Sequence, residues 1–149
     1  MKTHLAAIAC CSVLTAGISH ATVTDIDNAE LAALMASGVP VIDIRTAPEW
    51  QQSGIVPGSH LLTFFNERGQ ADPGAWLATA KDIARPDEPV VVICRTGNRT
   101  KAVSQFLSQQ AGYRRVYNVR LGIVAWAREG RPLAPAGKAL VACPAGKTC

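Results

Sequence analysis

The residues best suited to chemistry lie between Val90 and Thr100, VVVICRTGNRT, where a cysteine follows four apolar residues. The run Val90 to Ile93 predicts a buried strand, so Cys94 leaves the end of that strand. A short turn from a strand into a helix points backbone N–H groups inward, and the helix adds the positive end of its dipole. Such a loop favours an anion at its centre, which suits a reactive thiolate better than an inert buried thiol.

The residues after Cys94 can shape this loop. Gly97 supplies the backbone freedom of a tight turn, Asn98 tolerates left-handed geometry, and Thr100 can cap the following helix. The composition of the loop therefore favours a built anion site over a turn that merely happens to hold a cysteine.

Arg95 and Arg99 add two permanent positive charges, which together with the helix dipole favour the thiolate form of Cys94. Other cysteine chemistries have weaker support. The only histidine after residue 21 is His60, and earlier residues are expected to be removed, as argued below. No nearby sequence feature places His60 next to Cys94, as a Cys–His dyad would require. Cys94 has no cysteine or histidine nearby at metal-ligand spacing, so neither a metal nor another cofactor is expected.

Short apolar runs alternate with amphipathic segments, which predicts alternating strands and helices. Buried strands are expected at Pro40–Ile44, Leu61–Phe65, Val90–Ile93 and Val116–Val119. Helices are expected at 29–37 with Asp27 or Asn28 as cap, from the capping box Thr46–Glu49, and at Trp76–Ala84, Lys101–Gln110 and Ile123–Arg128. This order argues for an α/β domain with a central parallel sheet of about five strands and helices on both faces. Ligands of such sheets bind beyond the carboxyl ends of the strands, where Cys94 lies.

The size and charge of the chain limit its class. Its 149 residues, 48% of them hydrophobic, suffice for one domain with a proper core and are too few for two. The net charge of +4 is modest and the 15 Lys and Arg residues are scattered, which gives no indication of nucleic-acid binding. The balance favours small anionic molecules as ligands.

The N-terminus has the pattern of a secretory signal peptide. A basic residue precedes the uncharged apolar stretch Leu5–Ile18, and Ser19–Ala21 places small residues at both ends of a cleavage triplet. We expect residues 1–21 to be removed after the last of them, giving a periplasmic or secreted protein without a membrane attachment. A membrane anchor is less favoured because the apolar run is well short of the ~20 residues of a spanning helix. Lipid attachment at Cys10 or Cys11 is the second alternative.

Three cysteines remain after residue 21, namely Cys94, Cys143 and Cys149. In an oxidising compartment an odd number leaves one thiol outside any internal pairing. Cys143 and Cys149 bracket the segment CPAGKTC and are expected to form a disulfide, which leaves Cys94 free. We therefore expect a domain over residues 22–132, followed by a Pro-, Ala- and Gly-rich tail over residues 133–149.

The loop Cys94–Thr100 resembles the active-site loop of single-domain rhodanese-like sulfurtransferases, in which a cysteine carries a persulfide within a bowl of backbone amides. Three further segments resemble markers of this family in order and spacing: Asp43-Ile44-Arg45 with Glu49-Trp50, Ser53 to Ser59, and Leu121 to Trp126. Together they cover roughly Thr24 to Pro132. The chain departs from the family pattern at two positions. Ile55 stands where many members have histidine, and Leu121 replaces the first glycine of a common pair. Neither position takes part in the sulfur chemistry, so the departures concern local packing rather than the class of protein.

The resemblance implies that the Cys94 thiolate attacks the outer sulfur of thiosulfate, that sulfite leaves, and that the persulfide passes its sulfur to cyanide or another thiophilic acceptor. A protein acceptor is a further partner to consider. The residues expected to contact substrate are Arg95, Thr96, Gly97, Asn98, Arg99 and Thr100. An arginine directly after the cysteine favours thiosulfate as donor, because family members that use mercaptopyruvate tend to carry glycine there.

Two alternatives share a cysteine loop of this kind. Phosphatases and arsenate reductases also close their loop with an arginine, but they place one residue more between cysteine and arginine than the four that separate Cys94 from Arg99. A smaller bowl fits sulfur better than a tetrahedral phosphate. The other alternative is a persulfide relay or binding module that holds sulfur for an exported partner protein without rapid turnover.

The remaining family positions have structural interpretations. We expect Arg45 and Glu49 to form an ion pair, and Trp50 and Trp126 to lie in the core. Asp43 is the exception, because an acid at a strand end near Arg99 could support the loop.

Overall fold

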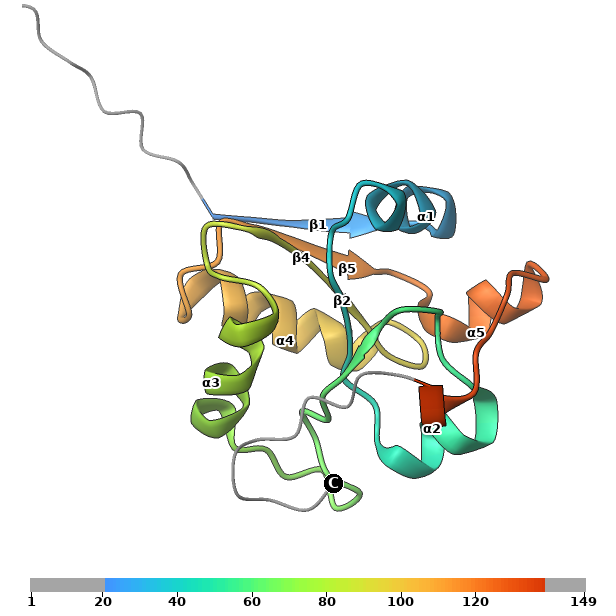
Figure 1. The fold of residues 1–149 in the computed structure, drawn as a ribbon. Helices are drawn as coiled ribbons and strands as arrows, with labels where there is room; N and C mark the ends of the chain where they lie inside the picture. The colour runs from blue at the N-terminus through green and yellow to red at the C-terminus, as the bar shows by residue number, and fades with distance from the viewer. Residues whose placement is uncertain (1–20, 139–149) are drawn as a thin grey trace, which may run out of the picture.

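The computed structural model describes residues 21–138 (Figure 1). Within them, five strands and five α-helices alternate. The strands are β1 (Thr22–Ile26), β2 (Val41–Asp43), β3 (His60–Leu61), β4 (Pro89–Ile93) and β5 (Arg115–Val119). The helices are α1 (Asn28–Ala36), α2 (Ala47–Ser53), α3 (Pro73–Ile83), α4 (Asn98–Gln109) and α5 (Gly122–Arg128), followed by a 3₁₀ turn at Ala136–Lys138. The expected signal peptide and the Cys143–Cys149 disulfide fall on residues outside the described range and stay predictions.

All strand pairs are parallel, and the sheet has the order β1-β5-β4-β2-β3. β4 lies at the centre, with Val91 opposite Val41 of β2 and Val90 opposite Val116 of β5. The prediction of a parallel sheet of about five strands is confirmed. Because β4 is central, its carboxyl end is held by a neighbour on each side, so Cys94 starts from a rigid support.

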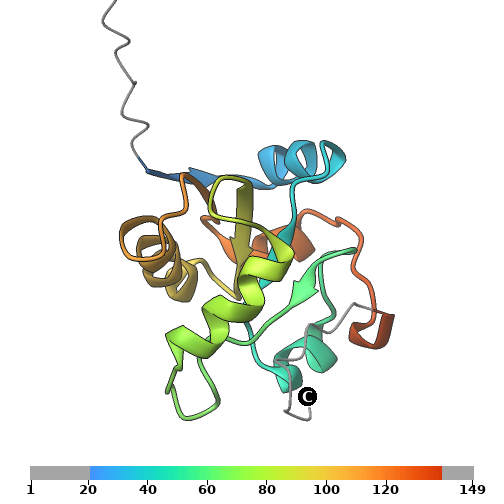
Figure 2. The same ribbon diagram turned by 60° about the vertical axis from the view of Figure 1, so that its left-hand side comes forward.

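Alternate residues of β4 enter two different cores, as expected for a strand buried on both faces. Val90 and Val92 pack in a cluster that includes residues of α3 and α4, whereas Val91 and Ile93 pack in a cluster that includes residues of α1 and α5. Figures 1 and 2 show these two helix layers on opposite faces of the sheet. The predicted helices on both faces are therefore confirmed.

A smaller third cluster lies beside α2 and contains Trp50, Ile55 and Leu61, with Ala134 and Ala136 packed against it. Ile55 and Ala134 exchange two backbone hydrogen bonds of 2.9 Å each, so the chain after α5 returns across α2. Trp50 is 8% exposed, and Trp126, in the second core, is 4% exposed, so both are core residues as expected.

The structure differs from the sequence-based prediction mainly at the edges of the sheet. β1 was not predicted, because only the last of its five residues is buried and no apolar run marks it. The strand pairs with β5 along its whole length, from Thr22 opposite Arg115 to Ile26 opposite Val119. Backbone hydrogen bonds to β5, rather than burial of side chains, therefore hold β1 in the sheet. The strand expected at Leu61–Phe65 is shortened to His60–Leu61 at the opposite edge. No helix between Ala21 and Lys138 is both long and apolar enough to cross a bilayer.

Candidate active site

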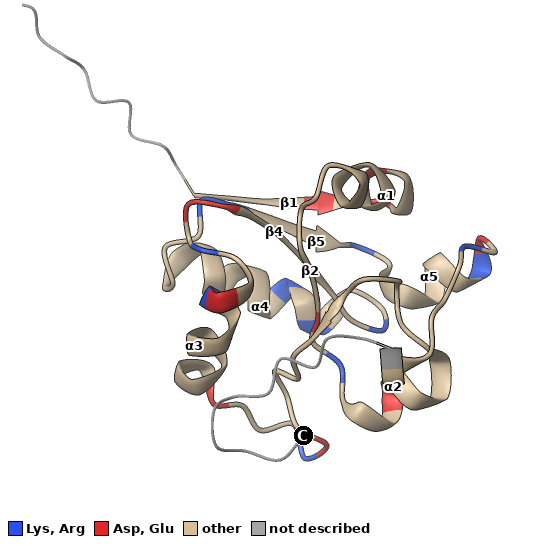
Figure 3. Ribbon diagram, in the orientation of Figure 1, with Lys and Arg blue, Asp and Glu red and all other residues tan. Residues whose placement is uncertain are grey.

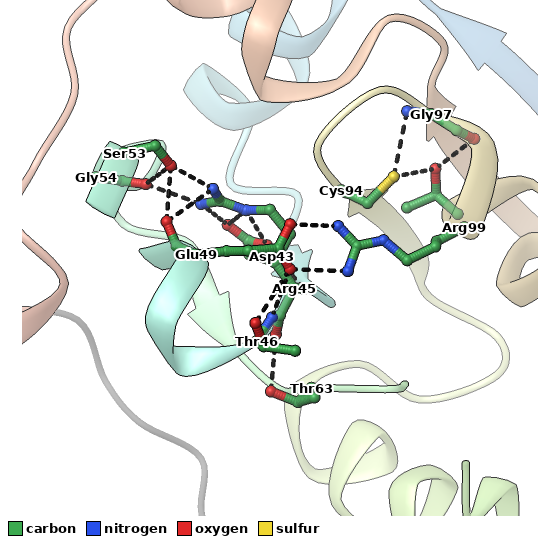
Figure 4. Close-up of polar contacts among 11 residues, drawn as sticks. Asp43, Arg45, Thr46, Glu49, Ser53, Gly54, Thr63, Cys94, Gly97 and Arg99 are labelled. Carbon is green, nitrogen blue, oxygen red and sulfur yellow. Dashed lines mark hydrogen bonds and ion pairs between the residues drawn. The ribbon is translucent and has the colours of Figure 1, made fainter. Parts of the chain in front are cut away.

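Cys94 follows β4 directly, and α4 begins four residues later at Asn98. The cysteine is 1% exposed. Its sulfur accepts a hydrogen bond of 3.2 Å from the backbone N–H of Gly97 (Figure 4). The same sulfur lies 3.6 Å from the hydroxyl oxygen of Thr100. The loop thus closes on the sulfur and presents two hydrogen-bonding groups to it.

Gly97 is the one left-handed residue of this turn, with φ of +89°. A Cβ atom at this position would lie 2.0 Å from the carbonyl oxygen of Arg120, which is too close for any side chain. The expected need for glycine in the turn is therefore confirmed. The expected left-handed tolerance of Asn98 is not used, because no non-glycine residue from Ala21 to Lys138 has a positive φ.

The role expected of Thr100 as the helix cap is wrong. α4 begins after Gly97, so Thr100 lies inside the first turn, where it is fully buried. Its hydroxyl donates to the carbonyl of Gly97 at 2.9 Å and faces Cys94. The helix begins earlier in the chain than the sequence suggested. The Thr100 hydroxyl therefore lies against the Cys94 sulfur, whereas a capping role would have directed that hydroxyl to the backbone N–H groups of the helix.

The start of α5 is bonded to the start of the cysteine loop. The N–H of Ile123 donates to the carbonyl of Cys94 at 2.9 Å, and that of Val124 donates to the carbonyl of Arg95 at 3.2 Å. Gly122 allows this approach, because a Cβ there would lie 2.4 Å from the Arg95 carbonyl oxygen. Leu121 departs from the family pattern, in which this position is glycine. Its side chain is 57% exposed and its φ is −106°, so neither the space nor the backbone at this position requires glycine.

Arg99 is held by Glu49 of α2. Its two terminal nitrogens donate to the two carboxylate oxygens at 2.8 and 2.6 Å (Figure 4). The hydrogen bond from Arg99 lowers the pKa of Glu49 to about 2, against the opposing effect of burial. The same bond raises the pKa of Arg99, and the charge of Cys94 adds a smaller effect in the same direction. The arginine is therefore a permanent cation that braces the loop.

The expected pairing of Arg45 with Glu49 is wrong. Arg45 instead pairs with Asp43 at 2.7 Å, and both side chains are almost completely buried. Its remaining hydrogens reach the hydroxyl of Ser53 at 2.6 Å and the carbonyl of Gly54 at 2.8 Å. Residues two apart at a strand end project to the same side, so Asp43 meets Arg45 first.

Asp43 consequently forms neither a hydrogen bond nor an ion pair with Arg99, contrary to expectation. Its segment meets the last residue of β4 through the backbone, where the N–H of Ile44 donates to the carbonyl of Ile93 at 3.0 Å. The acid that reaches Arg99 is Glu49, whose carboxylate also accepts from the backbone N–H of Thr46 at 3.1 Å. Sequence reasoning identified Glu49 as part of a capping box, but no local spacing could link it to an arginine 50 positions later.

Three loop residues, Arg95, Thr96 and Asn98, are exposed, whereas Gly97 and Thr100 are buried around the sulfur. The structure therefore separates the predicted site residues into an inner set that contacts Cys94 and an outer set that faces solvent. His60 lies on β3, which β2 separates from β4, and it is not a hydrogen-bond partner of Cys94. Over residues 21–138, no group of three His, Cys, Asp or Glu side chains could hold a metal ion.

The chain matches the model of the rhodanese-like domain over residues 27–129. A sulfurtransferase of Allochromatium vinosum is 36% identical over 118 residues, which cover 77% of this chain and 99% of the relative. Thiosulfate sulfurtransferase 18 of Arabidopsis thaliana is 26% identical over 117 residues, covering 74% of this chain and 83% of the relative. The crystal structure of a rhodanese-related protein of Thermoplasma volcanium superposes with a TM-score of 0.55 at 27% identity, covering 74% of this chain and 97% of that one.

The fold and the loop define an α/β protein with a buried cysteine at the carboxyl end of its central strand. The chain belongs to the rhodanese-like family. Its sulfurtransferase relatives support sulfur transfer as its general activity, with a sulfur donor and a sulfur acceptor as substrates.

Proposed function

We propose that this protein transfers the outer sulfur of thiosulfate, through a persulfide on Cys94, to cyanide or another thiophilic acceptor. The observation that carries the proposal is the placement of the Cys94 sulfur between the Gly97 N–H and the Thr100 hydroxyl. The name of the Arabidopsis relative supports thiosulfate as donor.

In the first step the Cys94 thiolate attacks the outer sulfur of thiosulfate. A sulfur–sulfur bond forms at Cys94, the sulfur–sulfur bond of thiosulfate breaks, and sulfite leaves with the electron pair. In the second step cyanide attacks the terminal sulfur, thiocyanate leaves, and the Cys94 thiolate returns. Hydrogen-bond donors aimed at a developing anion stabilise it without reorganisation, which is the role we assign to the Gly97 N–H. The Thr100 hydroxyl adds a second donor to the anionic sulfur when its proton turns from the Gly97 carbonyl toward Cys94.

The arginines have separate roles in this proposal. Arg95 is exposed and attracts the donor dianion, while Arg99 braces the loop. Glu49 occupies the end-on fork formed by the two terminal nitrogens of Arg99 and neutralises its charge, which weakens that guanidinium as a ligand for a phosphate group. This supports sulfur transfer over phosphate chemistry in a loop that is also one residue shorter than a phosphatase loop.

The test is thiocyanate formation from thiosulfate and cyanide by the protein and by Cys94→Ser. We expect turnover by the former and none by the latter, while the Cys143→Ser/Cys149→Ser variant retains it as the matched thiol control. Equal rates for the protein and Cys94→Ser would exclude this function. A mass gain of one sulfur atom on Cys94 without turnover would instead identify the persulfide relay.

We further propose that the protein is exported after removal of residues 1–21. In support, β1 begins at Thr22, directly after the expected cleavage position, so cleavage would leave the sheet intact. Intact-mass measurement on protein recovered from the cell envelope and medium tests this. A chain that keeps residues 1–21 and stays in the cytosol would refute it.

A further inference from the structure

Two cavities of about 460 Å³ each adjoin the cysteine loop. One lies between α2 and α5 and includes Arg95 and Arg128 in its lining. The other lies at the opposite end of the loop and is lined by Asn98 and Arg99 together with Phe65, Asn66, Glu67 and Gly69 of the β3–α3 connection. Equal in volume, the two cavities differ in charge.

The α2–α5 cavity carries two uncompensated positive charges. Of its charged lining residues, Arg45 is neutralised by Asp43 and Glu49 by Arg99. Neither Arg95 nor Arg128 has an ion-pair partner among residues 21–138. Figure 3 shows basic positions both in the β4–α4 loop and at the end of α5.

The other cavity has the opposite balance. Its arginine, Arg99, is neutralised by Glu49, and its remaining charged residue is the carboxylate of Glu67. An anionic molecule that approaches the loop is thus attracted more strongly to the α2–α5 cavity than to its neighbour. Because both guanidinium groups are exposed to solvent, each charge contributes modestly, so the two arginines must act together.

The α2–α5 cavity also has an apolar wall made by Ile123, Val124 and Ala127 of α5. The first two of these donate their backbone N–H groups to the carbonyls of Cys94 and Arg95, which fixes the wall against the loop. The volume lies in the range of sites for small organic molecules, about 300–1,000 Å³. Cyanide would leave most of it empty, and thiosulfate has no apolar part to place on the wall.

We propose that the α2–α5 cavity binds the sulfur acceptor, a small organic thiol that carries carboxylate groups, with Arg95 and Arg128 binding its carboxylates and α5 contacting its carbon chain. This inference rests on the proposed function and names the acceptor class for the same site. The acceptor thiolate attacks the terminal sulfur of the Cys94 persulfide and forms a new sulfur–sulfur bond. The old sulfur–sulfur bond breaks, Cys94 leaves as the thiolate, and the acceptor departs as an organic persulfide.

The first experiment measures the acceptor half-reaction alone. Protein carrying the persulfide is mixed with 2-mercaptoethanol, 3-mercaptopropionate or mercaptosuccinate, which carry zero, one and two carboxylates, and rates are compared per thiolate. We expect the rate to rise with carboxylate number. Arg128→Gln should lower the ratio of the mercaptosuccinate rate to the 2-mercaptoethanol rate about fivefold, the effect of one exposed charge.

The matched control is Arg114→Gln, which removes the same charge from an exposed residue that precedes β5, at the end of the sheet away from the loop. It should change the ratio by less than about twofold, since surface charges more than a Debye length away are screened. An equal ratio in Arg128→Gln and Arg114→Gln would overturn the proposal.

A second experiment needs no sulfur transfer. Alkylation of Cys94 by iodoacetate and by iodoacetamide is followed on the peptide that contains it, and the ratio of the two rates reports attraction of a carboxylate to the loop. We expect Arg128→Gln to lower this ratio and Arg114→Gln to leave it. An unchanged ratio would overturn the inference even if thiosulfate is turned over. A lowered ratio in a protein that forms no persulfide from thiosulfate would uphold the anion cavity and reject the proposed function.

Discussion

Glu49 and Arg99 join the first turn of α2 to the first turn of α4 by two hydrogen bonds of 2.8 and 2.6 Å. They are 50 positions apart in the chain, and their side chains are 25% and 30% exposed. A bidentate pair of this kind restricts orientation as well as distance. The geometry of the cysteine loop is thereby tied to the segment that follows β2.

The Glu49–Arg99 pair predicts a loss of stability in acid. The pKa of Glu49 falls from 4.5 to about 2 in the folded protein, so the native state binds fewer protons than the unfolded state between these values. The contribution is complete above pH 4.5 and disappears as the pH falls toward 2. With allowance for solvent screening we expect about 1–2 kcal/mol.

Urea unfolding of the protein and of Glu49→Gln at several pH values checks this prediction. The difference in unfolding free energy should be present at neutral pH and vanish in strong acid, whereas Glu67→Gln, at an exposed acid without an ion-pair partner among the described residues, should show little difference. A Glu49→Gln difference that is independent of pH would contradict the assignment.

Asp43 supports the fold more than the chemistry. Asp43→Asn leaves the buried guanidinium of Arg45 without its counter-ion, and breaking one partner of a buried pair costs about 3–5 kcal/mol. Urea unfolding at neutral pH measures the loss. Asp82→Asn, at an exposed position in the last turn of α3, serves as control and should change stability by less than about 0.5 kcal/mol. A loss below about 1 kcal/mol for Asp43→Asn would mean that solvent reaches the pair.

Gly97→Ala should destabilise the protein in two ways, through backbone strain and through a steric clash of the new Cβ atom with the Arg120 carbonyl. A left-handed alanine costs about 1–2 kcal/mol, and the new Cβ would also displace the Arg120 carbonyl. We therefore expect a loss of more than about 3 kcal/mol in unfolding free energy. Gly112→Ala isolates the strain, because Gly112 has φ of +77° and open space around its Cβ position. Equal losses in the two variants would show that the loop moves away freely.

Thr100→Val tests the hydroxyl that faces the sulfur. The change keeps the shape of the side chain but removes the donor to Gly97 and the polar contact with Cys94. We expect persulfide formation to slow about tenfold, the equivalent of one hydrogen bond. Thr100→Ser should restore most of the rate, and Thr79→Val in α3 should leave it unchanged. Stopped-flow sulfite release measures the step, and a Thr100→Val rate equal to that of the protein would remove the hydroxyl from the mechanism.

The inner part of the site was predictable because it is local. Cys94 and Gly97 lie in one short segment after a continuous apolar run, so the strand, the turn and the need for glycine follow from neighbouring residues alone. The alternation of apolar runs and amphipathic segments likewise predicted the parallel sheet and its two helix layers. β1 was not predicted because this edge strand has a single buried residue, so its sequence shows no apolar pattern. The strand is stabilised by its hydrogen bonds to β5, which no local sequence pattern indicates.

The sequence by itself determined that a thiol would stand at a strand end among basic residues, with glycine where the turn requires it. Only the tertiary structure decided which acid meets which arginine. Four charged residues of the site, Asp43, Arg45, Glu49 and Arg99, admit two pairings, and the choice depends on side-chain direction at the end of β2 and on the approach of α2 to α4. The same packing places Arg128 and Arg95 in the lining of one cavity, because the start of α5 is hydrogen-bonded to the cysteine loop. Contacts between distant segments depend on how whole elements pack, which local residue patterns do not encode.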